Sequence, residues 1–173
     1  MQIESLYNRA KMIMDKDYLS ARKLFEQIIQ LIGDKPISVH HDNELRILAL
    51  SYKNLFLISR LRDDLFATKS IEAFEMYFKK NYLDTEMYDS YILLLELTYQ
   101  YRKSNEILNN LLANSETKEL ALKYLSSIVY QIEGLQTLDD CVNYKQQLIE
   151  MSRDEHEKAR LQKELITLKE RNN

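Results

Sequence analysis

Residues that interrupt helices are almost absent from this chain, which has two glycines and one proline in 173 residues. Glycine and proline are the residues that most often end or break an α-helix. Apolar residues instead recur three and four positions apart through most of the sequence, and no stretch alternates apolar and polar residues as a half-buried β-strand does. We therefore expect an all-α fold of about nine amphipathic helices, paired as hairpins.

The length and the cysteine content indicate one domain, 1–173, in a reducing compartment. A chain of this size buries about two thirds of the surface that its unfolded form exposes. The single cysteine, Cys141, cannot form an internal disulfide, which favours the cytosol or the nucleus. The N-terminal stretch carries charges every few residues, unlike a signal peptide, and no window approaches the ~20 apolar residues of a membrane span. We expect a cytoplasmic or nuclear protein that does not insert into membranes, and its oligomeric state is open.

Charge is unevenly distributed along the chain. Residues 1–80 hold 13 Lys and Arg against 11 Asp and Glu, whereas residues 81–152 hold 5 against 11. An acidic surface repels phosphate backbones, so the central part argues against a direct nucleic-acid partner.

Turn and capping residues divide the chain into helix pairs. Asp17 is expected to begin a helix that Gly33 ends, and Pro36 prevents that helix from resuming. The expected units are 2–33, 43–80, 85–114 and 116–152, followed by a capping helix at 153–171. Single helices are expected over 43–61, 85–101, 104–113 and 116–132, with capping boxes at Thr137–Asp140 and Ser152–Glu155.

The expected helix 43–61 is apolar on most of its sides. Only Arg46, Lys53 and Arg60, each seven residues apart, form a polar line along it. A helix with so little polar surface must be covered by neighbours on two sides.

Two of the four units resemble the tetratricopeptide repeat. The run Asp17-Tyr18-Leu19-Ser20-Ala21, followed by Phe25 and Ile28, has the aromatic, small and apolar residues of that family's second helix. Tyr101, Ser104, Leu108 and Leu111 repeat the spacing in the third unit. The chain has no tryptophan, which the family pattern includes, and three units lack its loop proline. The resemblance implies a right-handed α-solenoid with a concave groove that holds a partner peptide.

The register of that resemblance also implies roles for residues of the third unit. Those expected at packing positions are Tyr88, Ile92, Leu95, Tyr99 and Tyr101, and those expected toward the groove are Glu86, Asp89, Leu93, Glu96 and Leu97. Three carboxylates on one helical face would favour a partner with a basic segment. The alternative is that these acids are only the solvated face of an amphipathic helix. The groove would then lie elsewhere, along Arg46 and Lys53 or on the exposed side of the expected last helix, 153–171.

Some members of the family bind a chain-terminal carboxylate with a clamp of Lys, Arg and Asn side chains. Asn8, Arg9, Lys53 and Asn54 are residues of those types. Their spacing does not follow the clamp, and Asp89 stands where a cation is needed, so we do not predict one.

We expect no catalytic or metal site. His40 and His41 are adjacent, so on a helix their side chains would diverge by ~100°, and no other histidine or cysteine joins them at a ligand spacing. The acid pairs Asp63–Asp64 and Asp139–Asp140 stand at expected helix starts, where they complement the helix dipole. Cys141 is expected to be buried in helix packing.

The expected function is therefore non-catalytic: a protein-interaction module, as an adaptor or assembly subunit, with no cofactor. One alternative is a bacterial signalling-peptide sensor of tetratricopeptide type, although the basic helix trio of its DNA-binding members is not evident here. Another is the helical-repeat arm of a large complex, although such arms generally finish in a winged-helix module with strands. An enzyme would need convergent polar groups presented by loops, and the connections here are short.

Overall fold

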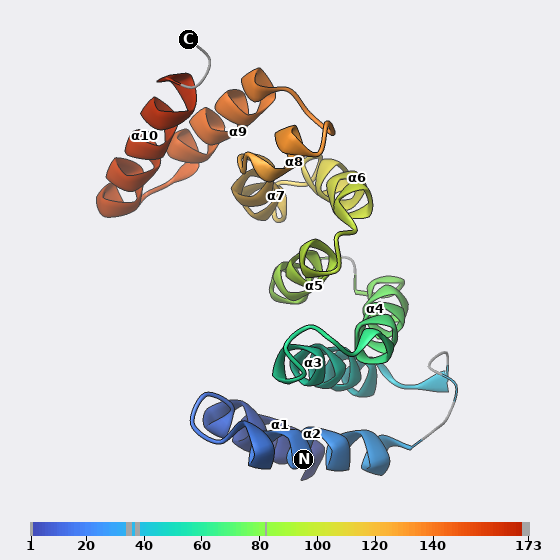
Figure 1. Cartoon of the computed structure of the whole chain (residues 1–173). Coiled ribbons are helices and arrows are strands. Elements are labelled where there is room, and N and C mark those ends of the chain that lie inside the picture. The colour runs from blue at the N-terminus through green and yellow to red at the C-terminus, as the bar shows by residue number, and fades with distance from the viewer. Residues whose placement is uncertain (1, 34–35, 37–38, 82, 171–173) are drawn as a thin grey trace. The chain divides into compact units, whose positions relative to one another are not determined.

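The computed structural model describes residues 2–33, Pro36, 39–81 and 83–170. These residues form ten α-helices and contain no β-strand, which confirms the all-α expectation. The helices are α1 (Gln2–Ile13), α2 (Tyr18–Ile32), α3 (Asp42–Ile58), α4 (Asp64–Phe78), α5 (Thr85–Leu97), α6 (Tyr101–Leu111), α7 (Lys118–Leu125), α8 (Val129–Ile132), α9 (Leu138–Met151) and α10 (Glu155–Glu170) (Figure 1). Position 171 of the expected capping helix lies outside the described residues.

The chain groups into two compact units, Met1–Thr98 with α1 to α5 and Tyr99–Asn173 with α6 to α10. The boundary falls inside the expected repeat unit 85–114, because α5 belongs to the first compact unit and α6 to the second. The expectation of a single domain over the whole chain stays a prediction.

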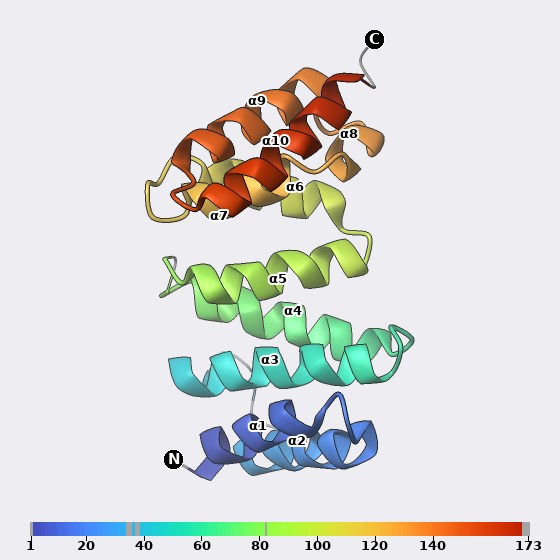
Figure 2. The same ribbon diagram turned by 90° about the vertical axis from the view of Figure 1, so that its left-hand side faces the viewer.

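In the first unit each helix packs on its neighbours along the chain. Contacts join α1 to α2, α2 to α3, α3 to α4 and α4 to α5, and α3 also contacts both α1 and α5. Figure 2 shows α1, α3 and α5 toward the viewer, with α2 and α4 behind them. The buried residues of α3 are Leu45, Ile47, Leu48, Ala49, Leu50, Ser51, Asn54, Leu55 and Phe56. The prediction that this helix is covered on two sides is confirmed.

Local capping sets the ends of α2 as the sequence predicted. The Asp17 carboxylate accepts a 3.0 Å hydrogen bond from the Ser20 amide, which satisfies one of the free N–H groups of the first turn. Gly33 ends the helix with a φ of 89°, a conformation that L side chains rarely adopt.

Two helices of the first unit end earlier than predicted. α3 stops at Ile58 instead of residue 61, because Arg60 and Leu61 have positive φ values of 57° and 61°. α5 stops at Leu97, and Tyr99 follows with a φ of 59° and is 82% exposed. The expected packing role of Tyr99 is therefore wrong, since the backbone leaves the helix before that residue.

In the second unit α6 packs on α7, α7 on α9 and α9 on α10. A buried apolar cluster joins α7, α9 and α10, and it consists of Leu122, Leu148 and Leu161, one from each helix. The expected helix 116–132 is two helices, α7 and α8, separated by residues 126–128. The Ser126 hydroxyl donates a 3.1 Å hydrogen bond to the Lys123 carbonyl near this break.

The two capping boxes predicted in this unit have different outcomes. The Thr137–Asp140 box is present at the start of α9 and is confirmed. Ser152 instead ends α9, and the first turn of α10 is capped by Asp154, whose carboxylate accepts hydrogen bonds from the amides of His156 at 2.8 Å and Glu157 at 3.3 Å. The predicted Ser152–Glu155 box is wrong, because the helix begins three residues after Ser152.

A bilayer-crossing helix needs about 20 apolar residues, and the described part of the chain contains none that satisfies this requirement.

Candidate functional site

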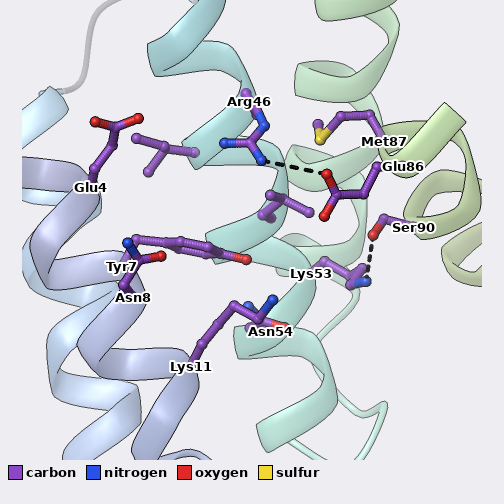
Figure 3. Close-up of a pocket in the computed structure, with 12 residues that line it drawn as sticks. Glu4, Tyr7, Asn8, Lys11, Arg46, Lys53, Asn54, Glu86, Met87 and Ser90 are labelled. Carbon is purple, nitrogen blue, oxygen red and sulfur yellow. Dashed lines mark hydrogen bonds and ion pairs between the residues drawn. The ribbon is translucent and has the colours of Figure 1, made fainter. Parts of the chain in front are cut away.

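A cavity of about 400 Å³ lies in the first unit between α1, α3 and α5 (Figure 3). Volumes of about 300–1,000 Å³ are typical of sites that bind small molecules. The lining residues are Glu4, Tyr7, Asn8 and Lys11 of α1, Arg46, Ile47, Leu50, Lys53 and Asn54 of α3, and Glu86, Met87 and Ser90 of α5. We refer to it as the α1/α3/α5 cavity.

The helix α1 presents its lining residues because they share one helical face. Glu4, Tyr7, Asn8 and Lys11 are spaced i, i+3, i+4 and i+7. The side chains of Glu4, Asn8 and Lys11 are exposed, and none forms a hydrogen bond or ion pair with the described part of the chain. These polar groups are therefore available to a ligand.

Tyr7 fixes α1 against its neighbours. Its ring is buried and lies 6.0 Å from that of Phe25 between centroids. Burial raises the pKa of Tyr7, whereas interaction with the Asn54 side chain and the charge of Arg46 oppose that shift. Asn54 is itself buried and lines the same cavity.

Lys53 is a half-buried cation that lines the cavity. Its Nζ atom donates a hydrogen bond of 3.0 Å to the Ser90 hydroxyl, which joins α3 to α5 (Figure 3). Burial lowers the pKa of Lys53 because desolvation disfavours the charged form. The charge of Asp89 opposes this shift, and the charge of Lys11 adds to it.

The helix α5 is held in place by contacts with α4. The Asp84 carboxylate caps α5 by accepting a 3.1 Å hydrogen bond from the Met87 amide, and it accepts another of 2.6 Å from the Tyr77 hydroxyl. Burial and this second hydrogen bond raise the pKa of Tyr77 to about 12. Phe78 and Tyr88 stack with ring centroids 3.8 Å apart. These contacts fix the helix that carries Glu86 and Ser90.

Opposite charges are separated along the α1/α3/α5 cavity. In Figure 3, Glu4, Arg46 and Glu86 lie at one end, whereas Lys11, Lys53 and Asn54 lie toward the other. Glu86 Oε2 is 4.0 Å from Arg46 Nη2, and the Glu86 side chain is 85% exposed. An ion pair this exposed contributes little to stability, so both groups can turn toward a ligand.

The structure brings together three of the six site residues proposed from the sequence. Arg46, Lys53 and Glu86 line the cavity. Asp89, Leu93 and Glu96 are on α5 but are not among the lining residues, although Asp89 acts electrostatically on Lys53. Leu93 is exposed, and Asp89 and Glu96 are half-buried.

The residues weighed for a carboxylate clamp are also partly brought together. Asn8, Asn54 and Lys53 line the cavity, whereas Arg9 is exposed on another side of α1. The lining residues that sequence reasoning missed are Glu4, Tyr7, Lys11, Ile47, Leu50, Met87 and Ser90. For α1 the available signal was the seven-residue spacing of Glu4 and Lys11, which matches that of Arg46 and Lys53.

The histidine and cysteine residues that the sequence analysis weighed for metal binding or thiol chemistry are held by contacts within the fold. His40 is buried with Nδ1 3.2 Å from the Glu44 carboxylate, and that carboxylate also accepts a 3.1 Å hydrogen bond from the His41 amide at the start of α3. Cys141 is fully buried as predicted, and burial raises the pKa of its thiol. Within the described residues, no three His, Cys, Asp or Glu side chains are grouped as metal ligands would be.

Comparison of this chain with protein-family models, curated proteins and solved structures finds no significant match.

Proposed function

We propose that this protein is a non-catalytic protein-interaction module, an adaptor or assembly subunit, that holds a segment of a partner polypeptide in the α1/α3/α5 cavity. The observation that carries the proposal is the cavity itself, which three helices line and in which Glu4, Asn8 and Lys11 of α1 have no hydrogen-bond or ion-pair partner in the described part of the chain. Such groups provide specificity when a ligand satisfies them.

The chemistry of the lining suits a polypeptide segment. Asn8 offers both a donor and an acceptor for peptide groups. Ile47, Leu50 and Met87 provide an apolar floor for a side chain. A volume of about 400 Å³ admits a short segment with its side chains but is too small for a folded partner domain.

We further propose that the first unit is a tetratricopeptide-like stack. In such a stack the first helix of each hairpin lines the concave groove. The proposal is supported by the origin of the lining residues, which come from α1, α3 and α5 and include none from α2 or α4.

A steric block tests the proposed function. Asn8→Trp places a bulky ring at the cavity, and Arg9→Trp makes the same change on an exposed neighbour outside the lining. Affinity capture from the native host, followed by mass spectrometry, compares the two variants with the parent. We expect Asn8→Trp to lose the co-purifying partner and Arg9→Trp to keep it. Retention of the same partners by both variants, each with parent-like circular dichroism, would exclude the cavity as the binding site.

A further inference from the structure

The separation of charge along the α1/α3/α5 cavity indicates which segment it would select, and this inference rests on the proposed function. Among the described lining residues, Glu4 and Glu86 lie at one end with one cation, Arg46, so the net charge of that end is negative. At the other end Lys11 and Lys53 outnumber Asp89, the acid that acts on Lys53, so the net charge there is positive.

Helix geometry sets the distance between the two ends. Seven residues separate Glu4 from Lys11 on α1, and seven separate Arg46 from Lys53 on α3. At a rise of ~1.5 Å per residue, each pair spans ~10 Å along its helix. A ligand that satisfies both ends must carry opposite charges about this far apart.

A polypeptide in polyproline II conformation matches this spacing. It rises ~3.1 Å per residue with three residues per turn, so side chains three positions apart lie on the same side, ~9 Å from each other. We propose that the α1/α3/α5 cavity selects an internal peptide segment with an acidic and a basic side chain three residues apart. The acidic group lies against Lys11 and Lys53, and the basic group lies against Glu4 and Glu86.

Simpler ligands leave one end of the cavity without a partner. A chain-terminal carboxylate would satisfy Lys11 and Lys53 but nothing near Glu4. A purely basic segment would satisfy Glu4 and Glu86 but would leave Lys53 half-buried beside the charge of Lys11. A free amino acid carries its two charges on one carbon and is too short to reach both ends.

Synthetic peptides with both termini blocked test this inference by fluorescence anisotropy. The probe is an acetylated, amidated and fluorescein-labelled peptide with the core Glu-Pro-Pro-Lys, since proline favours the polyproline II conformation. Its comparators are Gln-Pro-Pro-Lys, Glu-Pro-Pro-Gln, the reversed Lys-Pro-Pro-Glu, and a peptide whose only charge is a free terminal carboxylate. We expect the better of the two doubly charged peptides to bind about tenfold more tightly than any singly charged one, a difference of roughly 1.4 kcal/mol.

Variants assign each charge to its end of the cavity. Lys53→Met should remove the preference for Glu over Gln in the peptide, and Glu86→Gln should reduce the preference for Lys over Gln. Lys53→Arg should retain the first preference. Lys163 is an exposed lysine of α10, so Lys163→Met is the matched control and should change neither preference.

The outcomes separate this inference from the proposed function. Equal binding of the singly and doubly charged peptides, tighter binding of the free carboxylate, or no binding of any peptide would overturn the inference. If Asn8→Trp nevertheless abolishes capture of the native partner, the proposed function stands without it. If Asn8→Trp also keeps every partner, both proposals fail.

Discussion

The Lys53 ammonium donates a 3.0 Å hydrogen bond to the Ser90 hydroxyl, so two residues 37 positions apart in the sequence join α3 to α5 at the wall of one cavity. An ammonium group has three N–H donors. Since the described residues accept only this one hydrogen bond from it, two donors remain for a ligand. A desolvated cation with unused donors is costly in the free protein, and an anionic ligand would offset that cost.

The surroundings of Lys53 predict an unusual titration. Burial lowers its pKa from the usual 10.5, so Lys53 should deprotonate below pH 10.5 when its Cε protons are followed in an NMR titration. The signal is assigned by its loss in Lys53→Met. A midpoint for Lys53 at or above pH 10.5 would contradict the described burial.

The same shift has a consequence for stability. Because the folded-state pKa of Lys53 lies below the unfolded value near 10.5, the unfolded chain binds more protons between those two pH values. The free energy of unfolding of the parent, measured relative to Lys53→Met, should therefore rise as the pH increases through this window. Urea denaturation measures this difference in the free energy of unfolding. A difference that stays constant or falls across the window would contradict the prediction.

Ala21 should tolerate no enlargement. It has no exposed surface and lies on the face of α2 that also buries Phe25 and Ile28. Ala21→Leu should overpack this core and reduce the free energy of unfolding by roughly 1–3 kcal/mol. Lys163→Leu, made at an exposed site, should change it by less than about 0.5 kcal/mol. If Ala21→Leu and the parent have equal free energies of unfolding, the packing of α2 is wrongly described.

Replacement of Asp154 should destabilise the start of α10. Its carboxylate accepts two hydrogen bonds from amides of the first turn, at 2.8 Å and 3.3 Å. Asp154→Ala should therefore lower the free energy of unfolding by about 1 kcal/mol. Ser152→Ala is the matched control, because the Ser152 hydroxyl makes only a 3.4 Å contact with the Asp154 carbonyl. Chemical denaturation of the two variants measures the difference. A larger loss in Ser152→Ala would restore the capping box predicted from the sequence.

Local signals explain which parts of the fold were predictable. Asp17 and Gly33 set the ends of α2 through contacts within the same helix, so the sequence was sufficient to identify both. The end of α5 was not predictable from period alone. Apolar and aromatic residues continue past Leu97, but the Thr98 hydroxyl bonds to the Leu94 carbonyl, and Tyr99 takes a positive φ.

The cavity was predictable only in part, for a similar reason. Arg46 and Lys53 were identified because they interrupt an otherwise apolar helix. Glu4 and Lys11 lie on a helix with many polar residues, where a ligand-facing side and a solvated side have the same composition. Which side of α1 faces the cavity is decided by tertiary packing, in which the buried Tyr7 ring contacts the Phe25 ring of α2.

Site-specific photo-crosslinking tests the central claim, that a partner polypeptide occupies the α1/α3/α5 cavity, most directly. The photoreactive residue p-benzoylphenylalanine is installed at Asn8, in the cavity lining, or at Gln162, an exposed residue of α10, and the protein is irradiated in the native host. Mass spectrometry then identifies the crosslinked polypeptide and the attached segment. We predict a crosslink from Asn8 to one defined partner segment and none to that partner from Gln162. A partner that crosslinks from Gln162 but not from Asn8 would contradict the account.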